Sequence, residues 1–338
     1  MSIEITLHPK SASRDNLRQL LVDLGYVRCG HLWDWPKDSL HFHWFNNADY
    51  LSYDGVEATI YRPSSDDQEN SSLGACEWAL HTRTRSSASP DKDYQDQTIR
   101  AARAKFGGSF YNDWHGKNRY TYMETDGRDA VSRGIYLTYE GICRNIKALR
   151  FVVPEPLETM QKLVGTKDEI LAHADPNRVL YNALVPFALA SLEHFFSKSF
   201  KVLLRYDTQE EKRLSELNRK VDFEDVIAIK NGTKSLEDVV AGWYSFQNIS
   251  GIHKAFKDWL DIDFWKIVRR KKKVGNKIHF LEERLNYIIE FRHGVIRRGD
   301  VGSSLTKTQI IDILDTTLAI IDAFVDHLEQ HRAKVIRD

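Results

Sequence analysis

Residues Lys277–Asp300, KIHFLEERLNYIIEFRHGVIRRGD, form the stretch that decides how the chain is interpreted. Its apolar residues recur at steps of three and four, which predicts an amphipathic helix; they are Leu281, Leu285, Ile288, Ile289, Val295 and Ile296. Arg292 continues this series, so its guanidinium, which cannot lose its proton, needs partners on the apolar face. His293 and Arg297 lie four residues apart on a neighbouring face. We therefore expect a half-buried cationic cluster on this helix, which Gly299 ends.

Two interpretations of this cluster are open. In the first, Arg292 is a structural arginine paired with a carboxylate and His293 is solvated, because structural ion pairs are common in proteins. In the second, the cations hold a phosphate group, whose charge they neutralise. The spacing of the residues does not choose between them.

The order of residues from Arg292 to Gly299, RHGVIRRG, resembles the signature of HEPN domains, the helical domains found in many prokaryotic ribonuclease toxins and defence proteins. That signature is an arginine, a polar residue, three or four further residues and a histidine. Arg292 and His293 match its first two positions, and the last position falls at Arg297. Two more segments are similar to the same family, namely Ser191–Phe196, SLEHFF, and Ser245–Ile249, SFQNI, which His253–Lys257 follows.

The resemblance implies that two copies pack their motif helices together and cleave RNA without metal, by attack of the 2′-hydroxyl on the adjacent phosphate. Such chemistry needs a base and cations at the phosphate. Arg297 is always protonated and cannot act as a base, and His293 stands about one helical turn before the motif's last position, so it does not replace the missing histidine one for one. The resemblance therefore predicts a homodimeric, RNA-engaging protein of a prokaryotic defence or toxin–antitoxin system, in which catalysis is weakened or absent.

The expected site residues are Arg292, His293 and Arg297, and we expect no cofactor and no metal ion. Two alternatives remain open for the same residues. One is an active, metal-independent endoribonuclease that uses Arg292 and His293. The other is a non-catalytic interaction module, in which the helical domain supplies only a dimer interface and the N-terminal domain binds a partner protein or ligand.

Residues Lys266–Lys277, KIVRRKKKVGNK, contain seven basic residues and no acidic one. A solvated helix end or loop explains such a run, and so does an electrostatic footprint for nucleic acid. The run adjoins the motif helix in the sequence, which favours shared use of the two by RNA. The residues expected to contact nucleic acid are Arg269, Arg270, Lys271, Lys272, Lys273 and Arg298.

The composition is that of a folded protein without a global charge that attracts nucleic acid. Of 338 residues, 42% are hydrophobic, and 48 Lys and Arg balance 48 Asp and Glu, so any basic surface must be local. The three cysteines are widely spaced, which fits a reducing cytosol. The N-terminus lacks an apolar signal core, and the longest apolar run, Ala183–Leu192, is shorter than the roughly 20 residues that span a bilayer. We expect a soluble, cytoplasmic protein without membrane contact.

A segment with two prolines, Val152–Pro156, divides the chain into two predicted domains. The first, residues 1–155, is predicted to be α+β, with strands at Ser2–His8, Leu40–Phe45, Gly55–Tyr61 and Leu73–Arg83 and helices at Ser13–Leu24, Asp91–Phe106 and Asp126–Ala148. The second, residues 156–338, is predicted to be an all-α, HEPN-like helical bundle, with helices at Leu157–Ala172, Arg178–Arg205, Gln209–Lys220, Ser235–Tyr244, Ile249–Asp258, Lys277–Arg298 and Lys307–His331.

Two groups of residues in the first domain have the chemistry of a binding site. His41 and His43 fall on one side of a predicted strand, a spacing able to bind zinc if further ligands join them. No carboxylate or cysteine is obviously tied to that pair. Asp113-Trp114-His115 is either a nuclease-like or ligand site in a loop or a structural turn. We favour structural roles for both groups.

Overall fold

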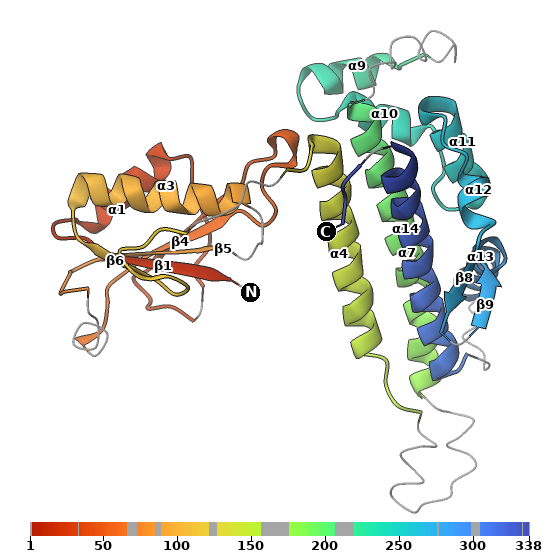
Figure 1. Cartoon of the computed structure of the whole chain (residues 1–338), viewed down its shortest axis with the longest axis horizontal. Coiled ribbons are helices and arrows are strands. Elements are labelled where there is room, and N and C mark those ends of the chain that lie inside the picture. The colour runs from red at the N-terminus through yellow and green to blue at the C-terminus, as the bar shows by residue number, and fades with distance from the viewer. Residues whose placement is uncertain are drawn as a thin grey trace, which may run out of the picture. The chain divides into compact units, whose positions relative to one another are not determined.

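The structure is a computed structural model, and it describes residues 2–32, 34–65, 73–84, 89–121, 127–156, 176–206, 220–275, 277–298, 305–332 and 334–337, with the side chains of residues 89, 176, 178 and 296–298 left aside. The chain divides into two compact units, Met1–Ala130 and Val131–Asp338 (Figure 1). Each unit has its own hydrophobic core, so each is described by itself.

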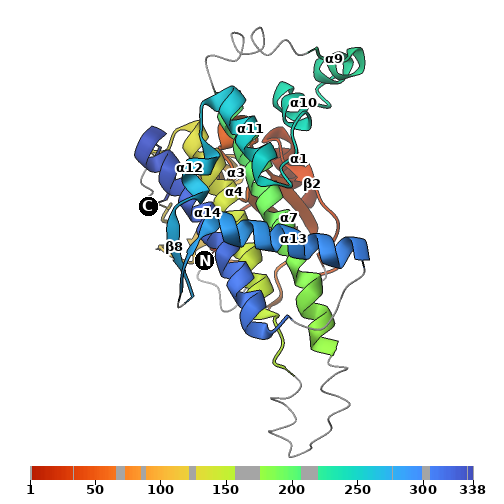
Figure 2. The ribbon, with the colours of Figure 1, turned by 90° about the vertical axis from the view of Figure 1, so that its right-hand side faces the viewer.

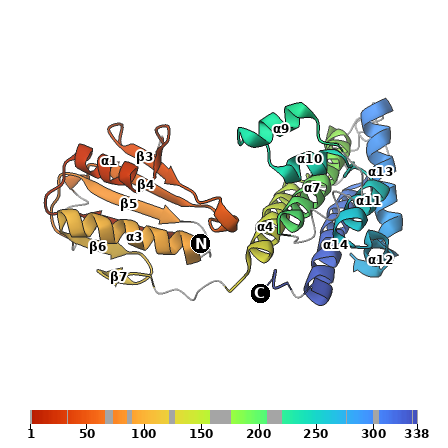
Figure 3. The same cartoon turned by 90° about the horizontal axis from the view of Figure 1, so that it is seen from above.

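The first unit is an antiparallel sheet with two helices, α1 and α3, on one of its faces (Figure 3). Its strand order is β2-β3-β4-β5-β1-β6-β7, and a short 3-10 turn, Ala48–Tyr50, precedes β4. The strands are β1 Ile3–His8, β2 Val27–Arg28, β3 Leu40–Trp44, β4 Val56–Tyr61, β5 Ala79–Thr84, β6 Ser109–Asn112 and β7 Gly116–Lys117, and the helices are α1 Arg14–Asp23 and α3 Ser89–Phe106.

The alternation of β1 explains where the core of this unit lies. Ile3, Ile5 and Leu7 are buried against the helices, and the residues between them face the opposite side of the sheet. The Oγ of Ser13 accepts the backbone N–H of Asn16 at 3.2 Å and so caps α1, as the sequence predicts. The α+β character of this region is therefore confirmed, although β5 is shorter than the expected strand and β2, β6 and β7 were not expected.

The second unit is a helical assembly centred on α7, against which α10, α11, α13 and α14 lie. Figure 2 shows α13 crossing α7. The ring of Phe196 on α7 lies 4.9–6.3 Å from the rings of Phe256, Phe264 and Phe324, which ties four helices together. The helices are α4 Ala130–Phe151, α7 Pro176–Arg205, α9 Phe223–Lys230, α10 Leu236–Gly242, α11 Ile249–Leu260, α12 Phe264–Val268, α13 Leu281–Arg298 and α14 Lys307–Arg332.

The expected domain boundary at residue 155 is wrong, because α4 belongs to the helical unit. Tyr139 on α4 donates a hydrogen bond to Asp322 on α14 at 2.9 Å, and Arg150 pairs with Asp315 at 2.8 Å. The two prolines that suggested the boundary mark only the end of α4. The expected helix Leu157–Ala172 lies outside the described residues, as does all of the expected helix Gln209–Lys220 except its last residue.

The second unit is also not purely helical. Strands β8, Lys271–Val274, and β9, Lys277–Phe280, form a hairpin in the basic run, where the sequence predicts a helix end or a loop followed by the start of the motif helix. The turn contains Gly275 at φ +58°, a conformation that L side chains rarely adopt. The motif helix therefore begins at Leu281 rather than at Lys277, and two short helices, α9 and α12, were not predicted.

Candidate functional site

Arg292 forms an ion pair within its own chain. The buried residues Leu281, Leu285 and Ile288 turn one face of α13 inward, and Arg292 continues that face. Its Nη1 donates a hydrogen bond to Oε1 of Glu193 on α7 at 2.7 Å. The two side chains keep only 16% and 20% of their surface exposed. The partner that a half-buried guanidinium requires is thus a carboxylate on the neighbouring helix, as the first interpretation of the cluster expects.

The electrostatics of this pair are not those of a fully compensated ion pair. Burial raises the pKa of Glu193 above its usual 4.5, and the charge and hydrogen bond of Arg292 only partly offset that effect. A guanidinium has five N–H donors, and the hydrogen bond to Glu193 uses one of them. Glu193 therefore fixes the orientation of Arg292 through this hydrogen bond.

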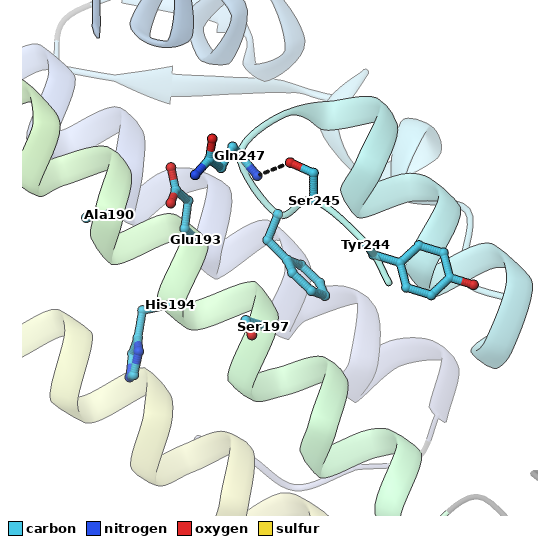
Figure 4. A pocket seen from close by; sticks show the side chains of 8 residues that line it. Ala190, Glu193, His194, Ser197, Tyr244, Ser245 and Gln247 are labelled. Atoms are coloured by element: carbon cyan, nitrogen blue, oxygen red, sulfur yellow. Dashed lines mark hydrogen bonds between the residues drawn. The ribbon is translucent and has the colours of Figure 1, made fainter. Parts of the chain in front are cut away.

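An open hollow of about 640 Å³ lies over Glu193 (Figure 4). One wall comes from α7 and the other from the segment between α10 and α11. Figure 4 shows the side chains of Glu193 and Gln247 pointing toward one another across it, whereas His194 points toward α4. The lining residues are Ala190, Glu193, His194, Ser197, Tyr244, Ser245, Phe246 and Gln247.

Residues at the start of α11 fix the wall formed by Tyr244–Gln247. The side chain of Asn248 accepts the backbone N–H of Gly251 at 2.7 Å and caps the helix. A Cβ at Gly251 would lie 2.0 Å from the carbonyl oxygen of Ser245, so only glycine allows this approach. Tyr244 is tied to the same helix, because Nε1 of Trp259 donates a hydrogen bond to its hydroxyl at 2.9 Å.

Two of the three segments expected to resemble HEPN domains line the hollow, and the third is joined to its wall through Arg292, which pairs with Glu193 but is not itself a lining residue. Arg292 comes from the motif helix, Glu193 from SLEHFF and Gln247 from SFQNI. These segments are far apart in the sequence, since Glu193 and Arg292 are 99 residues apart. The sequence singled out the segments but assigned no role to Glu193 or Gln247, and the pattern of residues around them carries no local signal of their pairing.

The other motif residues are not gathered at the hollow by any described contact. The side chain of His293 is exposed on α13, away from the face that Arg292 shares with the buried leucines. Arg297 and Arg298 lie in α13, but their side chains are outside the described set. His194 is a second imidazole on α7, and burial, together with the charges of Lys198 and Lys201, lowers its pKa.

Some cations of the basic run are paired with carboxylates, and those on the outer face of the hairpin are exposed. Lys272 pairs with Asp326 on α14 at 2.7 Å, and Arg269 pairs with Glu282 at 3.0 Å, so both are partly neutralised. Lys271 and Lys273 are exposed on the other face and have no ion pair with any described residue. Arg270 lies near His327, whose pKa burial and neighbouring cations lower to about 4.

The candidate groups of the first unit have structural partners. Nδ1 of His41 shares a hydrogen bond with the Thr59 hydroxyl at 3.0 Å, and Nε2 of His43 donates to the Asp54 carbonyl, also at 3.0 Å. Asp113 closes a turn at the sheet edge, where its Oδ1 accepts the N–H of Glu4. Across the described part of the chain, no three His, Cys, Asp or Glu side chains are arranged to hold a metal ion.

No protein-family model matches this chain, and neither a curated protein nor a solved structure is significantly similar to it. Within the described residues one stretch, Val179–Arg205 of α7, is long and apolar enough to cross a bilayer, and 44% of its apolar window is buried in the fold. The core helix of a water-soluble protein meets the same criteria, so this stretch is weak evidence for a membrane span.

Proposed function

We propose that the helical unit is a HEPN-like domain that engages RNA at the hollow beside Arg292 and at the basic hairpin. The observation that carries the proposal is the ion pair from the motif arginine to Glu193, a carboxylate that lines an open hollow together with Gln247. A guanidinium held in place by a carboxylate is preorganised for a phosphate, because its orientation is set before the ligand arrives.

The hairpin supplies basic residues for the proposed contact with RNA. Lys271 and Lys273 point away from α14 and are not neutralised by a described carboxylate, so they are available to phosphates. Basic residues of this kind supply affinity that does not depend on sequence and falls with salt. The equal numbers of acidic and basic residues in the whole chain leave this local surface as the attractive feature.

The proposed activity is RNA binding with weak or absent cleavage. Arg297 stands at the motif position of the histidine and cannot accept a proton at physiological pH. His293 directly follows Arg292 on α13, and His194 directly follows Glu193 on α7. Because neighbouring positions on a helix point about 100° apart, each histidine lies on a different face from the residue of the Glu193–Arg292 pair beside it. From the resemblance we propose that the chain is a cytoplasmic, homodimeric protein of a prokaryotic defence or toxin system.

The second candidate is a non-catalytic interaction module. The ion pair between Arg292 and Glu193 favours it, because a charge that is satisfied inside one chain leaves less attraction for an external phosphate. In that case the helical unit serves as a scaffold, and the first unit binds the partner protein.

A salt titration of RNA binding separates the two candidates. The full chain should bind a labelled RNA at low salt, and the affinity should fall steeply between about 50 and 200 mM salt. Each phosphate that a cation neutralises on a single strand contributes about 0.7 to the slope of log affinity against log salt, so changing both Lys271 and Lys273 to alanine should reduce that slope by about 1.4. Lys234→Ala, which removes a lysine paired with Asp225 instead, is the matched control. Absence of RNA binding at low salt would leave only the interaction module.

Cleavage is tested separately, with RNA incubated in EDTA. We expect little or no cutting by the wild-type protein. Efficient metal-independent cutting that Arg292→Ala abolishes would instead establish the endoribonuclease.

A further inference from the structure

A stripe of aromatic and cationic side chains runs along α13 beside the face that packs on α7. Arg284, Tyr287 and Phe291 are three and four residues apart, which places them on one side of the helix, and Phe280 directly precedes the helix. We refer to these four residues, Phe280, Arg284, Tyr287 and Phe291, as the aromatic stripe. Phe280 is the last residue of β9, and α13 follows it directly. From Phe280 to Phe291 the stripe extends by about 16 Å, at 1.5 Å for each helical residue.

Rings and cations contact one another along this stripe. Nζ of Lys271 lies 4.8 Å from the centre of the Phe280 ring, and Cζ of Arg284 lies 5.5 Å from the centre of the Tyr287 ring. The rings of Tyr287 and Phe291 are 6.2 Å apart. Aromatic rings interleaved with lysine and arginine are the arrangement on which bases of a single-stranded nucleic acid stack.

The stripe is accessible. Phe280 and Tyr287 keep 39% and 38% of their surface exposed, although aromatic rings are usually buried when a core can take them. Ile278 extends the apolar surface onto the hairpin and stands directly opposite Lys273 in the ladder, as Phe280 stands opposite Lys271. The outer face of the hairpin and the aromatic stripe therefore form one continuous surface.

The charges beside the stripe are unequal on its two sides. Arg284, Lys271 and Lys273 have no ion pair with a described residue. Glu283 and Glu290 are exposed. Each stands one residue before a member of the stripe, on the side of the stripe that lies away from the buried face of the helix. A polynucleotide would therefore place its phosphates toward the lysines and its bases over the rings.

We propose that this surface binds unpaired nucleotides, so that the RNA engaged by the helical unit is single-stranded. The inference rests on the proposed RNA-binding function and names its substrate class. A duplex presents phosphates to the lysines but keeps its bases stacked within the helix, so it gains nothing from the exposed rings. The stripe ends at Phe291, which directly precedes Arg292, the partner of Glu193.

The test measures the affinity of the full chain for a labelled oligouridine of about 12 nucleotides and for an RNA duplex of equal length. We expect the single strand to bind at least about tenfold more tightly, because base stacking on an aromatic ring contributes about a factor of 5 to 150 for each base. Tyr287→Ala should weaken oligouridine binding by a factor in that range and leave duplex binding unchanged. Tyr287→Phe should retain the affinity, whereas Tyr287→Leu, which keeps apolar surface without a ring, should lose it.

A matched control is available on α9. Phe223 is 78% exposed but stands beside Glu224 and Asp225, so Phe223→Ala removes an exposed ring from acidic surroundings and should not change RNA affinity. Thermal unfolding of each variant checks that the exposed substitutions leave the fold intact.

The outcomes distinguish this inference from the proposed function. Equal affinity for single strand and duplex, or full affinity in Tyr287→Ala, would overturn the single-strand inference while RNA binding itself stands. No binding of either RNA at low salt would overturn both. Retention of a protein by this surface that Tyr287→Ala abolishes, with no RNA bound, would assign the stripe to a protein partner and also overturn the inference.

Discussion

Breaking the ion pair between Arg292 and Glu193 tests how the motif helix is held. At an effective dielectric constant of about 20, opposite unit charges at the 2.7 Å separation of Nη1 and Oε1 attract by about 6 kcal/mol. Burial of two ions costs several kcal/mol each, and both side chains here are mostly buried. We therefore expect a net coupling free energy of about 1–3 kcal/mol between the two residues.

The measurement is a double-mutant cycle by urea denaturation of the full chain. Arg292→Met keeps much of the length of the side chain, and Glu193→Gln keeps the shape of the carboxyl group, so each removes charge with little change in packing. Arg292→Met should be the more damaging single change, because it leaves a buried carboxylate without its cation. The double variant should be more stable than the sum of the single effects predicts.

The pH dependence of Arg292→Met has a definite sign. The pKa of Glu193 in the folded protein already lies above its ordinary value because of burial, and removal of Arg292 takes away the cation that lowers it. The folded protein then holds the Glu193 proton more tightly than the unfolded chain does. The ionised carboxylate is a cost to folding at neutral pH, and this cost disappears as the pH falls through the raised pKa. The deficit of Arg292→Met should therefore shrink in mildly acidic buffer.

Two results would refute this reasoning. A coupling free energy below about 0.5 kcal/mol is within the range of independent sites, and it would show that the pair does not orient the motif helix. A deficit of Arg292→Met that does not depend on pH would show that a change in packing, and not the unpaired carboxylate, causes it.

Four further substitutions test other parts of the fold. Gly251→Ala places a Cβ 2.0 Å from the Ser245 carbonyl oxygen and should cost about 1–3 kcal/mol of unfolding free energy, whereas Gly141→Ala, with nothing within 4 Å, should be neutral or stabilising. Arg337→Ala removes a hydrogen bond to Asp326 at 2.6 Å and should lower the free energy of unfolding by about 1 kcal/mol at neutral pH, an effect that high salt should reduce. Burial and the charge of Arg83 lower the pKa of His81 to about 4, so wild-type stability should decline as pH falls from about 6.5 towards 4. His81→Gln should remove that part of the decline in a pH series of denaturation curves.

The helices of the second unit could be predicted because their apolar periodicity is long and regular. In α14 the buried residues recur at helical steps from Ile310 to Leu328, and the expected and observed bounds agree within one residue at its end. In α11 the expected and observed starts agree at Ile249, where Asn248 supplies a capping side chain, and the helix continues two residues beyond the expected end, to Leu260. Periodicity over several turns identifies a helix even when its neighbours are unknown.

The hairpin was missed because its stability is tertiary. Three consecutive lysines do not alternate with apolar residues, so a strand is not the expected conformation. In the fold, Val274 is buried and Lys272 pairs with Asp326, and these interactions hold β8 against α14. The domain boundary failed for a related reason, since the prolines after α4 report only local chain geometry, whereas the hydrogen bond from Tyr139 to Asp322 decides to which unit the helix belongs.

Only part of the candidate site could be predicted from the sequence. The helical spacing placed Arg292 on the apolar face and required a partner, but spacing cannot identify a carboxylate 99 residues away. The aromatic stripe was visible in principle, because Phe280, Arg284, Tyr287 and Phe291 follow helical steps. It was overlooked because the apolar series one position further along the helix is longer and dominates the pattern.

Because the aromatic stripe and the buried series on α13 are offset by one residue, substitutions on this helix can separate RNA affinity from stability. The series Leu281, Leu285, Ile288 and Arg292 lies on the face of α13 turned toward α7. Each member of the aromatic stripe stands one residue before a member of that series. Neighbouring positions on a helix point about 100° apart, so substitutions in the stripe should change RNA affinity without changing stability. Substitutions in the buried series should lower stability first, and Arg292 alone belongs to both the packing and the proposed contact with phosphate. A variant set that moved affinity and stability together at Tyr287 would show that the stripe belongs to the core and not to a binding surface.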